Sequence, residues 1–468
     1  MDEKRNGRVG KLVVGESSSM RILLTVHQFF PKYAAGTEVL TYSVARELIA
    51  RGHEVRIFTA HPVEQELPDM DRFNVYEYER IPVYRFLHSY MPMAGQDSKV
   101  ELSFDNHLAA DFFKKALAEY RPDLVHFFHL NRLGCGLVEQ AVNESLPAYY
   151  TPTDFWAICP TAQLVLCDGR PCSGPSMYAG NCVKHFAANT QKGVIGTLAR
   201  WLPLVASEWL AKLTKAERMP PYPHRMEVQA IACRLSRTVA QLNRLSNIVS
   251  PNKFMTSKLV QYGVRPELIT QSAFGVDVPG HAAPQRSAIR NPLRIGYIGT
   301  LAPHKGCHIL IEAFNALPSG SAILKIYGNM QDFPEYILEL RRFASRQENI
   351  EFCGVFHNSK IAEVMADIDV LVVPSLWFEN TPLVLYSAQA ARCPVIASDF
   401  PGISEVVKDQ INGLLFEPGN SKALETQLRR LLGEAGLAEQ LSANAQHPKS
   451  IAEYVDELLL IWQKKKIG

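Results

Sequence analysis

One glutamate stands out as a candidate for chemistry because of the residues around it. Glu379 lies in the segment Ser375-Leu376-Trp377-Phe378-Glu379-Asn380-Thr381-Pro382-Leu383, among small hydrogen-bonding residues. An apolar run at 370–374 precedes this segment, and an apolar helical pattern and a second buried run at 394–399 follow it. In open α/β sheets, ligands bind just past the carboxyl ends of parallel strands, where helix N-termini offer free N–H groups to anions. A carboxylate there suits a ligand that carries both phosphate and hydroxyls, such as a nucleotide sugar.

Two glycine-containing loops are further candidates. Gly299-Thr300-Leu301-Ala302-Pro303-His304-Lys305-Gly306 follows an apolar run at 293–298, so its backbone can approach a diphosphate and Lys305 can neutralise it. Pro31-Lys32-Tyr33-Ala34-Ala35-Gly36-Thr37-Glu38 is the matching loop earlier in the chain. The alternatives are a solvated lysine in the first loop and a plain turn capped by Thr37 in the second. No Gly-x-Gly-x-x-Gly run follows the first strand, which disfavours a dinucleotide dehydrogenase.

Size and composition limit the class of protein. A length of 468 residues predicts two domains, and 47% hydrophobic with 21% charged residues is typical of a globular chain. The net charge of +2 gives no support to nucleic-acid binding. No apolar run reaches the about 18 residues that span a bilayer, and no signal core follows Met1. We therefore expect a cytoplasmic protein with free thiols, and a disordered or non-native leader at 1–19.

Two series of strands and helices divide the chain. The first begins at 21–26 and passes through a helical pattern and Gly52 to a strand at 54–59, which is typical of a right-handed crossover. A polar linker at 281–287 precedes the second series, which begins at 293–299. Further strands are predicted at 124–128, 148–151, 247–250, 324–327, 350–353, 369–374 and 395–398. We predict an α/β protein with two doubly wound, Rossmann-like domains that face each other across a cleft. The predicted segments are 20–283, 290–440 and a C-terminal helical segment, 441–468, that packs back on the first domain.

Residues 155–225 fit neither series and are predicted to form an insertion on the cleft side of the first domain. The insertion contains four cysteines and a nearby histidine: Cys159, Cys167, Cys172, Cys182 and His185. Because no Cys-x-x-Cys pair is present, packed free thiols are favoured over a zinc site, which stays an alternative. The stretch 198–213 is amphipathic, with Trp201 and Trp209 near basic residues. It either packs under the insertion or rests on an anionic membrane face.

Seven motifs, in a fixed order along the chain, carry a resemblance to one family. They are Ala35-Gly36-Thr37-Glu38, Arg51-Gly52-His53-Glu54-Val55, Phe274-Gly275-Val276-Asp277, Tyr297-Ile298-Gly299 with His304-Lys305-Gly306, Glu379-Asn380-Thr381-Pro382-Leu383, Pro394-Val395-Ile396-Ala397-Ser398-Asp399 and Asn412-Gly413-Leu414-Leu415-Phe416. Single motifs are weak, but their order and spacing from about residue 20 to about 440 are specific. On these residues the chain resembles the retaining GT-B glycosyltransferases of the "glycosyl transferases group 1" class, which are family 4-like.

The resemblance implies a nucleotide-sugar donor site in the second domain and a site for a glycan or lipid-linked acceptor in the first. Lys305 would hold the donor diphosphate, and Glu379 would lie beside the sugar hydroxyls. The remaining residues implied in donor binding are Gly36, Gly299, Asn380, Thr381, Pro382, Leu383 and Ser387. The resemblance implies no metal and no cofactor, because the lysine and a helix N-terminus carry the leaving-group charge. It also implies same-face attack, in which the leaving phosphate takes the acceptor proton and no protein nucleophile is needed.

Two positions depart from the family pattern. The family usually has a second glutamate, thought to hold the ribose hydroxyls, eight positions after the first, and this chain has Ser387 there. The family also tends to have an arginine after the glycine turn, where this chain has Thr300. Serine hydrogen-bonds a hydroxyl but supplies no charge, so the diphosphate would depend on Lys305, helped by His304. These departures keep a non-catalytic GT-B binding subunit as an alternative.

Two candidates for the acceptor side follow strands of the first domain. The family often carries a histidine beside the transferred sugar, and we predict that His129 is that residue, both catalytic and acceptor-binding. His126 is instead predicted to be a buried core residue. Asp154 in the segment Thr151-Pro152-Thr153-Asp154-Phe155-Trp156 is predicted either to bind the acceptor or to cap the first turn of the insertion.

These observations lead to one prediction of function and two alternatives. We expect a cytoplasmic, metal-independent retaining glycosyltransferase of cell-surface polysaccharide biosynthesis, with Glu379, Lys305 and His129 as catalytic residues. The amphipathic stretch places it at the inner face of the membrane, as a peripheral membrane protein. The alternatives are another GT-B sugar-nucleotide enzyme, an epimerase or hydrolase, and the binding subunit. The sugar, the nucleotide and the acceptor linkage are not predicted.

Overall fold

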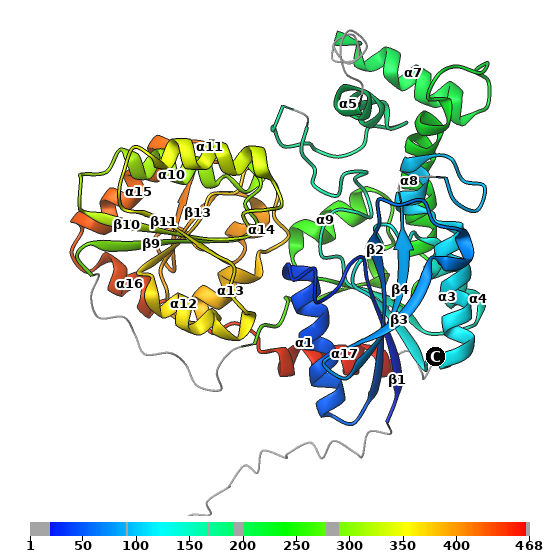
Figure 1. Ribbon diagram of the computed structural model, residues 1–468, viewed down its shortest axis with the longest axis horizontal. Coiled ribbons are helices and arrows are strands. Elements are labelled where there is room, and N and C mark those ends of the chain that lie inside the picture. The colour runs from blue at the N-terminus through cyan, green and yellow to red at the C-terminus, as the bar shows by residue number, and fades with distance from the viewer. Residues whose placement is uncertain (1–18, 90–91, 167, 191–200, 278–289, 465–468) are drawn as a thin grey trace, which may run out of the picture.

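Two α/β domains lie side by side, and a helical insertion projects from the second half of the N-terminal domain (Figure 1). The computed structural model describes residues 19–89, 92–166, 168–190, 201–277 and 290–464. The expectations for the leader at 1–18, the linker at 281–287, Cys167 and residues 198–200 therefore lie outside the described residues. Among the helices in these ranges, none combines the length and apolar character that spanning a bilayer requires.

The N-terminal sheet has the order β3-β4-β2-β1-β5-β6-β7-β8 among the described residues, and only β3 runs antiparallel to its neighbour. Its strands are β1 (Arg21–Val26), β2 (Glu54–Pro62), β3 (Phe73–Tyr78), β4 (Ile81–His88), β5 (Leu124–Phe127), β6 (Ala148–Tyr150), β7 (Asn247–Ser250) and β8 (Ile269–Gln271). Ile22, Leu24 and Val26 face one hydrophobic cluster, and Leu23 faces the other. The apolar run at β1 forms a strand because both faces of this parallel sheet are covered.

The helices of this domain cover both faces of the sheet and build the insertion. They are α1 (Gly36–Ala50), α2 (Lys99–Phe104), α3 (His107–Tyr120), α4 (Gly136–Asn143), α5 (Gly180–Thr190), α7 (Leu204–Lys215), α8 (Arg225–Leu242) and α9 (Lys253–Gln261), with 3-10 turns η1 (Asp69–Asp71) and η2 (Pro266–Leu268). The insertion consists of α5 and α7, which pack on α8 and form the top of the molecule in Figure 1. The described residues of 155–225 thus form an added layer beyond the sheet.

The C-terminal sheet is fully parallel, with the order β11-β10-β9-β12-β13-β14 in the part of the chain that is described. Its strands are β9 (Leu293–Ile298), β10 (Ala322–Tyr327), β11 (Ile350–Gly354), β12 (Val370–Val373), β13 (Val395–Ser398) and β14 (Leu414–Phe416). Its helices are α10 (Cys307–Asn315), α11 (Pro334–Ala344), α12 (Ile361–Asp367), α13 (Leu383–Ala390), α14 (Pro401–Ser404), α15 (Ser421–Gly433) and α16 (Leu437–Ala443), with 3-10 turns η3 (Pro303–Lys305) and η4 (Asn358–Lys360). Residues of β12 alternate between two clusters, which again marks a strand buried on both faces.

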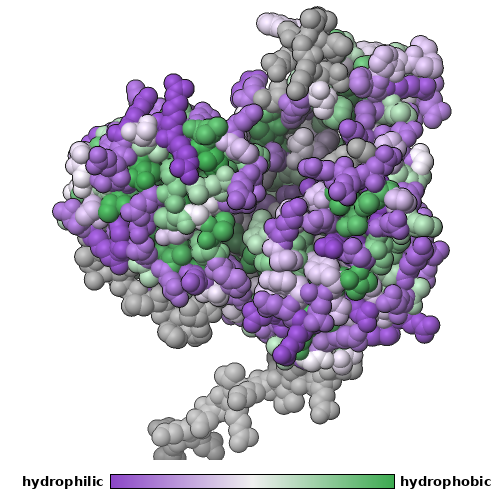
Figure 2. All heavy atoms as spheres, in the orientation of Figure 1, coloured by the Kyte–Doolittle hydropathy of each residue, from purple (hydrophilic) through white to green (hydrophobic). Residues whose placement is uncertain are grey.

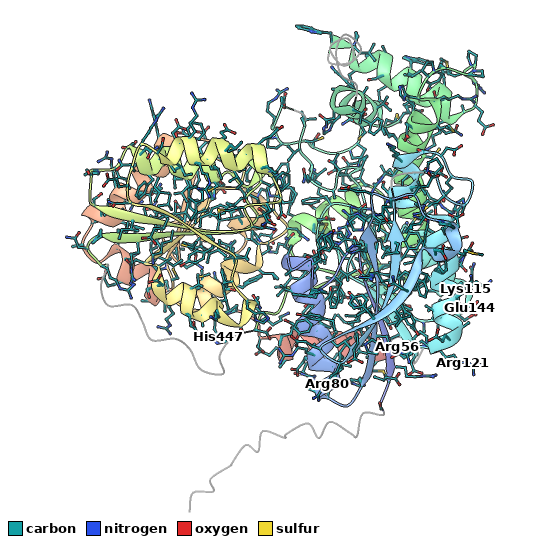
Figure 3. The ribbon with its side chains drawn as sticks, viewed as in Figure 1. Arg56, Arg80, Lys115, Arg121, Glu144 and His447 are labelled. Atoms are coloured by element: carbon teal, nitrogen blue, oxygen red, sulfur yellow. The ribbon has the colours of Figure 1, made fainter. Side chains whose placement is uncertain are left out.

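The last helix, α17 (Ile451–Lys464), lies against the N-terminal domain. His447, labelled in Figure 3, marks where the chain leaves the C-terminal domain before this helix. Tyr149 Oη donates a hydrogen bond to the Trp462 carbonyl oxygen (3.2 Å), and Trp462 Nε1 donates to His126 Nδ1 (3.2 Å). His126 is completely buried, as predicted for a core residue.

Candidate active site

The strand orders define where a ligand is expected. In each sheet the chain order reverses between two adjacent strands, β9 and β12 in the C-terminal domain and β1 and β5 in the N-terminal domain. Loops that leave the carboxyl ends of such a strand pair diverge and open a crevice, which is where ligands bind in open α/β folds. Lys305 follows β9 and Glu379 follows β12, whereas His129 follows β5. Most of the predicted site residues thus lie in the loops of these two crevices, and Figure 2 shows a hollow between the two domains.

The centre of the C-terminal crevice is a buried ion pair between Lys305 and Glu379. Lys305 Nζ lies 2.8 Å from Glu379 Oε1, and the side chains are 24% and 6% exposed. The same carboxylate oxygen accepts hydrogen bonds from Ser375 Oγ (2.6 Å) and Trp377 Nε1 (2.7 Å). The ammonium also lies 4.7 Å from the centroid of the Trp377 ring, within reach of a cation–π contact. Three donors therefore fix one glutamate oxygen in place.

The protonation state of Glu379 follows from these contacts. Burial raises the pKa of Glu379, but the positive charge of Lys305 and the three hydrogen bonds together outweigh burial and hold it below its ordinary value. The glutamate is therefore an anion at neutral pH. His304 behaves differently, because burial and the neighbouring Lys305 lower its pKa to about 4. His304 packs edge-on against Trp377 and is neutral in this structure, and its help to Lys305 with a diphosphate stays a prediction.

Glycines let the loops of this crevice approach each other closely. Gly306 has φ +72°, and a Cβ there would collide with the carbonyl oxygen of Pro374 at the end of β12. A Cβ on Gly402 would collide with the carbonyl oxygen of Glu379. The backbone hydrogen bond from Leu376 N–H to the His304 carbonyl oxygen (2.8 Å) joins the same two loops. The position of Lys305 relative to Glu379 is thus set by backbone contact and by side chains together.

Asn380 and Thr381 use their side chains to contact the N-terminal domain. Asn252 Nδ2 donates to Asn380 Oδ1 (3.0 Å) and to Thr381 Oγ1 (3.1 Å), and Asn380 Nδ2 donates to the Pro152 carbonyl oxygen (2.8 Å). Thr381 has φ +62°, an unusual backbone conformation for a β-branched residue. The side chains of this segment hold the two domains together, which leaves its backbone for any contact with a ligand.

The remaining residues predicted to bind the donor lie around this pair. Pro382 precedes α13 and Leu383 begins it, and a Cβ on Gly36 would lie 3.8 Å from Leu383 Cδ1, so Gly36 does face the C-terminal domain. Gly299 follows β9, and its N–H donates to the Tyr327 carbonyl oxygen (3.1 Å). Ser387 Oγ donates to the Leu383 carbonyl oxygen (3.3 Å), so its hydroxyl is used by the helix itself.

The N-terminal crevice brings His129 and Asp154 together. His129 Nδ1 accepts a hydrogen bond from the Asn131 N–H (3.1 Å), so Nε2 carries the hydrogen and donates to Asp154 Oδ2 (2.7 Å). His129 is 2% exposed and the Asp154 side chain is 25% exposed. Asp154 Oδ1 also accepts the Trp156 N–H (2.8 Å), so the capping contact that the sequence left open is present beside the contact with His129.

Sequence reasoning assigned no role to three side chains in these crevices: Asn252, His27 and Glu38, the last of which stands in the motif Ala35-Gly36-Thr37-Glu38. Asn252 joins the domains, and His27 and Glu38 lie beside His129, where the His27 and His129 ring centroids are 4.0 Å apart. Glu38 carried one signal, since it occupies the third position of α1, where a glutamate closes a capping box. Its burial and its proximity to a histidine depend on tertiary packing and leave no trace in the sequence.

The cysteines of the insertion and the labelled charges on the surface belong to neither crevice. All eight described cysteines are free thiols, and in the described part of the chain no three His, Cys, Asp or Glu residues are arranged to hold a metal. Burial raises the pKa of Cys182, and the nearby thiols of Cys159 and Cys172 raise it further. Lys115 and Arg121, labelled in Figure 3, lie on the flank of the N-terminal domain that faces away from the C-terminal domain.

Comparison with known proteins agrees with this architecture. Residues 34–157 match the family described as Glycosyltransferase Family 4, and residues 282–447 match the family described as Glycosyl transferases group 1. The crystal structure of Anabaena HepE in complex with UDP and glucose superposes with a TM-score of 0.62 at 18% identity, covering 95% of this chain and 100% of that one. The chain belongs to the group 1 glycosyltransferases and has the GT-B fold.

Curated relatives match over parts of their length. D-inositol 3-phosphate glycosyltransferase of Salinispora arenicola is 27% identical over 281 residues, which cover 54% of this chain and 61% of that protein. Amylovoran biosynthesis glycosyltransferase AmsK of Erwinia amylovora is 26% identical over 188 residues, which cover 38% of this chain and 46% of that protein. The chain spans less than two thirds of the length of these relatives.

Proposed function

We propose that this protein is a retaining glycosyltransferase that transfers a sugar from a nucleotide-sugar donor to a glycan or lipid-linked acceptor during cell-surface polysaccharide synthesis, on the cytoplasmic side of the membrane. The observation that carries the proposal is the buried Lys305–Glu379 pair at the crevice between β9 and β12. The name of AmsK, which refers to amylovoran biosynthesis, supports a polysaccharide product. The UDP and glucose of the HepE complex support the class of donor.

The pair suits both ends of such a donor. Lys305 supplies a cation for the diphosphate, whose negative charge grows as the bond to the sugar breaks, and a dry site strengthens this attraction. Glu379 is held as an anion, so its carboxylate can accept hydrogen bonds from sugar hydroxyls. In the proposed reaction the acceptor oxygen attacks the anomeric carbon on the face that the diphosphate leaves. The acceptor proton passes to the departing phosphate oxygen, so neither a protein nucleophile nor a metal is required.

Donor binding is the first test. We expect one nucleotide sugar from a panel to stabilise the protein by about 2.7 kcal/mol at a concentration one hundred times its dissociation constant. Thermal unfolding with each donor, at fixed protein concentration, measures this. Glu379→Gln should lose most of the stabilisation. A panel in which no donor shifts the unfolding temperature contradicts the nucleotide-sugar proposal.

Product analysis separates the proposed transferase from the alternatives. A transferase releases nucleoside diphosphate at a rate that depends on acceptor, whereas a hydrolase releases it equally without acceptor. An epimerase changes the sugar and leaves the nucleotide sugar intact. A binding subunit, which Thr300 and Ser387 keep as an alternative, shows the donor-induced shift without turnover.

A lipid-linked acceptor is supported by an apolar surface on the insertion. Val205 and Trp209 lie four residues apart in α7 and are 68% and 56% exposed, and Trp201, just before the helix, is 82% exposed. Lys212 Nζ lies 4.9 Å from the Trp209 ring centroid. Exposed tryptophans beside lysines are typical of helices that lie in the interface of an anionic membrane.

Vesicle binding tests this surface separately from catalysis. We expect the protein to sediment with anionic phospholipid vesicles, and Val205→Asp with Trp209→Asp to reduce the bound fraction several-fold. Leu338→Asp with Val355→Asp is the matched control, because these side chains are 69% and 72% exposed on the C-terminal domain. Equal binding by the two double variants contradicts a membrane contact through α7.

A further inference from the structure

Four titratable side chains from four segments meet at the N-terminal crevice. His27 follows β1, Glu38 lies in the first turn of α1, His129 follows β5 and Asp154 follows β6. His129 Nε2 is 2.7 Å from Asp154 Oδ2, the His27 ring lies 4.0 Å from the His129 ring, and His27 Nδ1 is 3.7 Å from Glu38 Oε1. The result is a continuous row of carboxylate, imidazole, imidazole and carboxylate, in which His129 and Asp154 are the two residues that the sequence analysis named separately as acceptor-side candidates.

The two atoms at the centre of the other half have no hydrogen-bond partner. Glu38 is completely buried, and its Oε2 accepts the Ala35 N–H (2.7 Å), but its Oε1 has no partner among the described residues. His27 Nδ1 is likewise buried and without a partner in that part of the chain. The His27 side chain is nevertheless 16% exposed, so its accessible part lies elsewhere on the ring. A buried polar atom without a partner is costly, and here two such atoms face each other slightly beyond hydrogen-bond length.

The charge states of this pair follow from its surroundings. Burial raises the pKa of Glu38 to about 7, although the Ala35 N–H, the nearby His129 and a hydrogen bond with the Gln28 side chain oppose the rise. Burial, together with His129 and Arg132, holds the pKa of His27 well below its ordinary value. His27 is therefore a neutral imidazole throughout the physiological range, whereas Glu38 gains or loses a proton within it.

A neutral imidazole beside a titrating carboxyl has two arrangements. When Glu38 is ionised, Nδ1 of His27 carries the hydrogen and donates it to Oε1, so Nε2 presents a lone pair. When Glu38 is protonated, its O–H donates to Nδ1, so Nε2 carries the hydrogen. The buried carboxyl thus decides whether Nε2 accepts or donates a hydrogen bond. Contacts of this kind are often long in the absence of substrate and shorten when it binds.

We propose that His27 is an acceptor-binding residue that holds a sugar hydroxyl beside the attacking one, and that Glu38 is the positioning residue that sets its tautomer. The proposal rests on the proposed function, because it places a glycan acceptor in the N-terminal crevice. His27 supplies no positive charge, so this part of the crevice suits neutral hydroxyls better than phosphate or carboxylate. With Glu38 ionised, Nε2 accepts the hydroxyl hydrogen, whereas the attacking hydroxyl still gives its proton to the leaving phosphate.

Glu38→Gln is the informative variant. The glutamine carbonyl still accepts the Ala35 N–H and preserves the cap of α1, while its amide N–H donates to His27 Nδ1. This substitution therefore fixes the hydrogen of His27 on Nε2 at every pH. Glu47→Gln is the matched control, since Glu47 lies on the same helix and pairs with Arg51 (2.8 Å) at a distance from the crevice.

Nuclear magnetic resonance of protein labelled with ¹⁵N-histidine tests the tautomer without any substrate, with His27 assigned from the spectrum of His27→Gln. In the wild type and in Glu47→Gln, we expect the hydrogen of His27 to move from Nε2 to Nδ1 as the pH rises through about 7. In Glu38→Gln it should stay on Nε2. The proposal is overturned if the tautomer of His27 does not change with pH in the wild type. It is also overturned if the tautomer changes with pH in Glu38→Gln as it does in the wild type.

Acceptor kinetics test the contact itself. We expect His27→Gln and Glu38→Gln each to raise the acceptor KM about tenfold at pH 8, with donor-induced stabilisation unchanged. The acceptor KM of the double variant should be no higher than that of either single variant, because both substitutions remove the same hydrogen bond. The wild-type kcat/KM for acceptor should rise with pH through about 7, and that of Glu38→Gln should stay low and flat. An unchanged acceptor KM in His27→Gln, or a double variant in which the two increases in KM multiply, contradicts the contact between His27 and the acceptor. A wild-type protein that binds no nucleotide sugar contradicts the proposed function itself.

Discussion

At the scale of single residues, the Lys305–Glu379 pair links stability to function. Lys305→Ala leaves the buried carboxylate oxygen Oε1 of Glu379 with two donors among the described residues, Ser375 and Trp377, so the pKa of Glu379 should rise. We expect the free energy of unfolding at pH 7 to fall by about 2 kcal/mol. This is less than the about 3–5 kcal/mol for fully buried pairs, because Lys305 is 24% exposed. Urea denaturation measures this change, and the donor-induced stabilisation should disappear in the same variant.

A matched control and a pH series make this prediction specific. Lys325→Ala removes another lysine pair of the same domain, with Asp367 (2.5 Å), and should leave donor binding intact.

The lowered pKa of Glu379 means that the contribution of this carboxylate to stability is present above the ordinary carboxyl pKa of 4.5 and is lost as pH falls through the lowered pKa. Glu379→Gln should therefore show a weaker loss of stability in acid. Equal effects of the two lysine variants on donor binding would contradict the assignment.

For single residues, the sequence predicted where a side chain lies along the fold better than which other side chain it contacts. Lys305 and Glu379 were placed in loops after strands because apolar runs and glycines are visible in the sequence. The pair itself joins residues 74 positions apart and becomes apparent only once β9 and β12 are known to be neighbours. The neutral state of His304 was likewise not predictable from the sequence, since it depends on burial against Trp377.

At the scale of elements, two loops meet because a glycine stands where no side chain fits. Gly306→Ala adds a methyl group that collides with the Pro374 carbonyl oxygen and also forces an alanine to φ +72°. We expect a loss of more than about 3 kcal/mol in unfolding free energy, of which about 1 kcal/mol reflects the left-handed backbone. Chemical denaturation measures the loss.

Gly320→Ala separates the two causes. Gly320 lies in the same domain with φ +75°, and nothing lies within 4 Å of the position that a Cβ would take. Its substitution should lower the free energy of unfolding by only about 1 kcal/mol. Similar losses in the two variants would show that backbone conformation alone, and not the approach of η3 to β12, makes Gly306 necessary.

Two different physical reasons explain the elements that the sequence missed. The strands with continuous apolar runs were predicted, because burial on both faces produces an unmistakable pattern. The hairpin of β3 and β4 was missed, since its turn consists of Glu79 and Arg80 at φ +46° and +66°, residues that give no turn signal. β14 has only three residues, Leu414–Phe416, and is recognisable as a strand mainly through its pairing with β13.

At the scale of the whole molecule, a few polar contacts act beside apolar ones, such as Phe254 against Phe378, to set the relative position of the domains. Glu405 of the C-terminal domain accepts the N–H groups of Lys253 and Phe254 at the start of α9 (both 2.8 Å), and Asn252 bonds Asn380 and Thr381. The sequence predicted two domains from its repeated pattern. The individual contacts were not predictable, because they join residues 128 to 152 positions apart in the chain that belong to domains with separate sheets.

The domain interface also bears on donor binding, because Asn380 and Thr381 follow Glu379 directly. Asn252→Ser keeps an N-cap for α9, since a serine hydroxyl accepts the Met255 N–H as Asn252 Oδ1 does (2.7 Å), but it removes the amide that donates to Asn380 and Thr381. We expect small-angle X-ray scattering to show a wider distribution of domain orientations and donor affinity to fall about tenfold, with each domain still folded. Asn420→Ser at the N-cap of α15, within the C-terminal domain, should change neither quantity. If Asn252→Ser binds donor as tightly as the wild type while its domains move apart, the segment after Glu379 is ordered by its own loop, and the interface has no part in shaping the donor site.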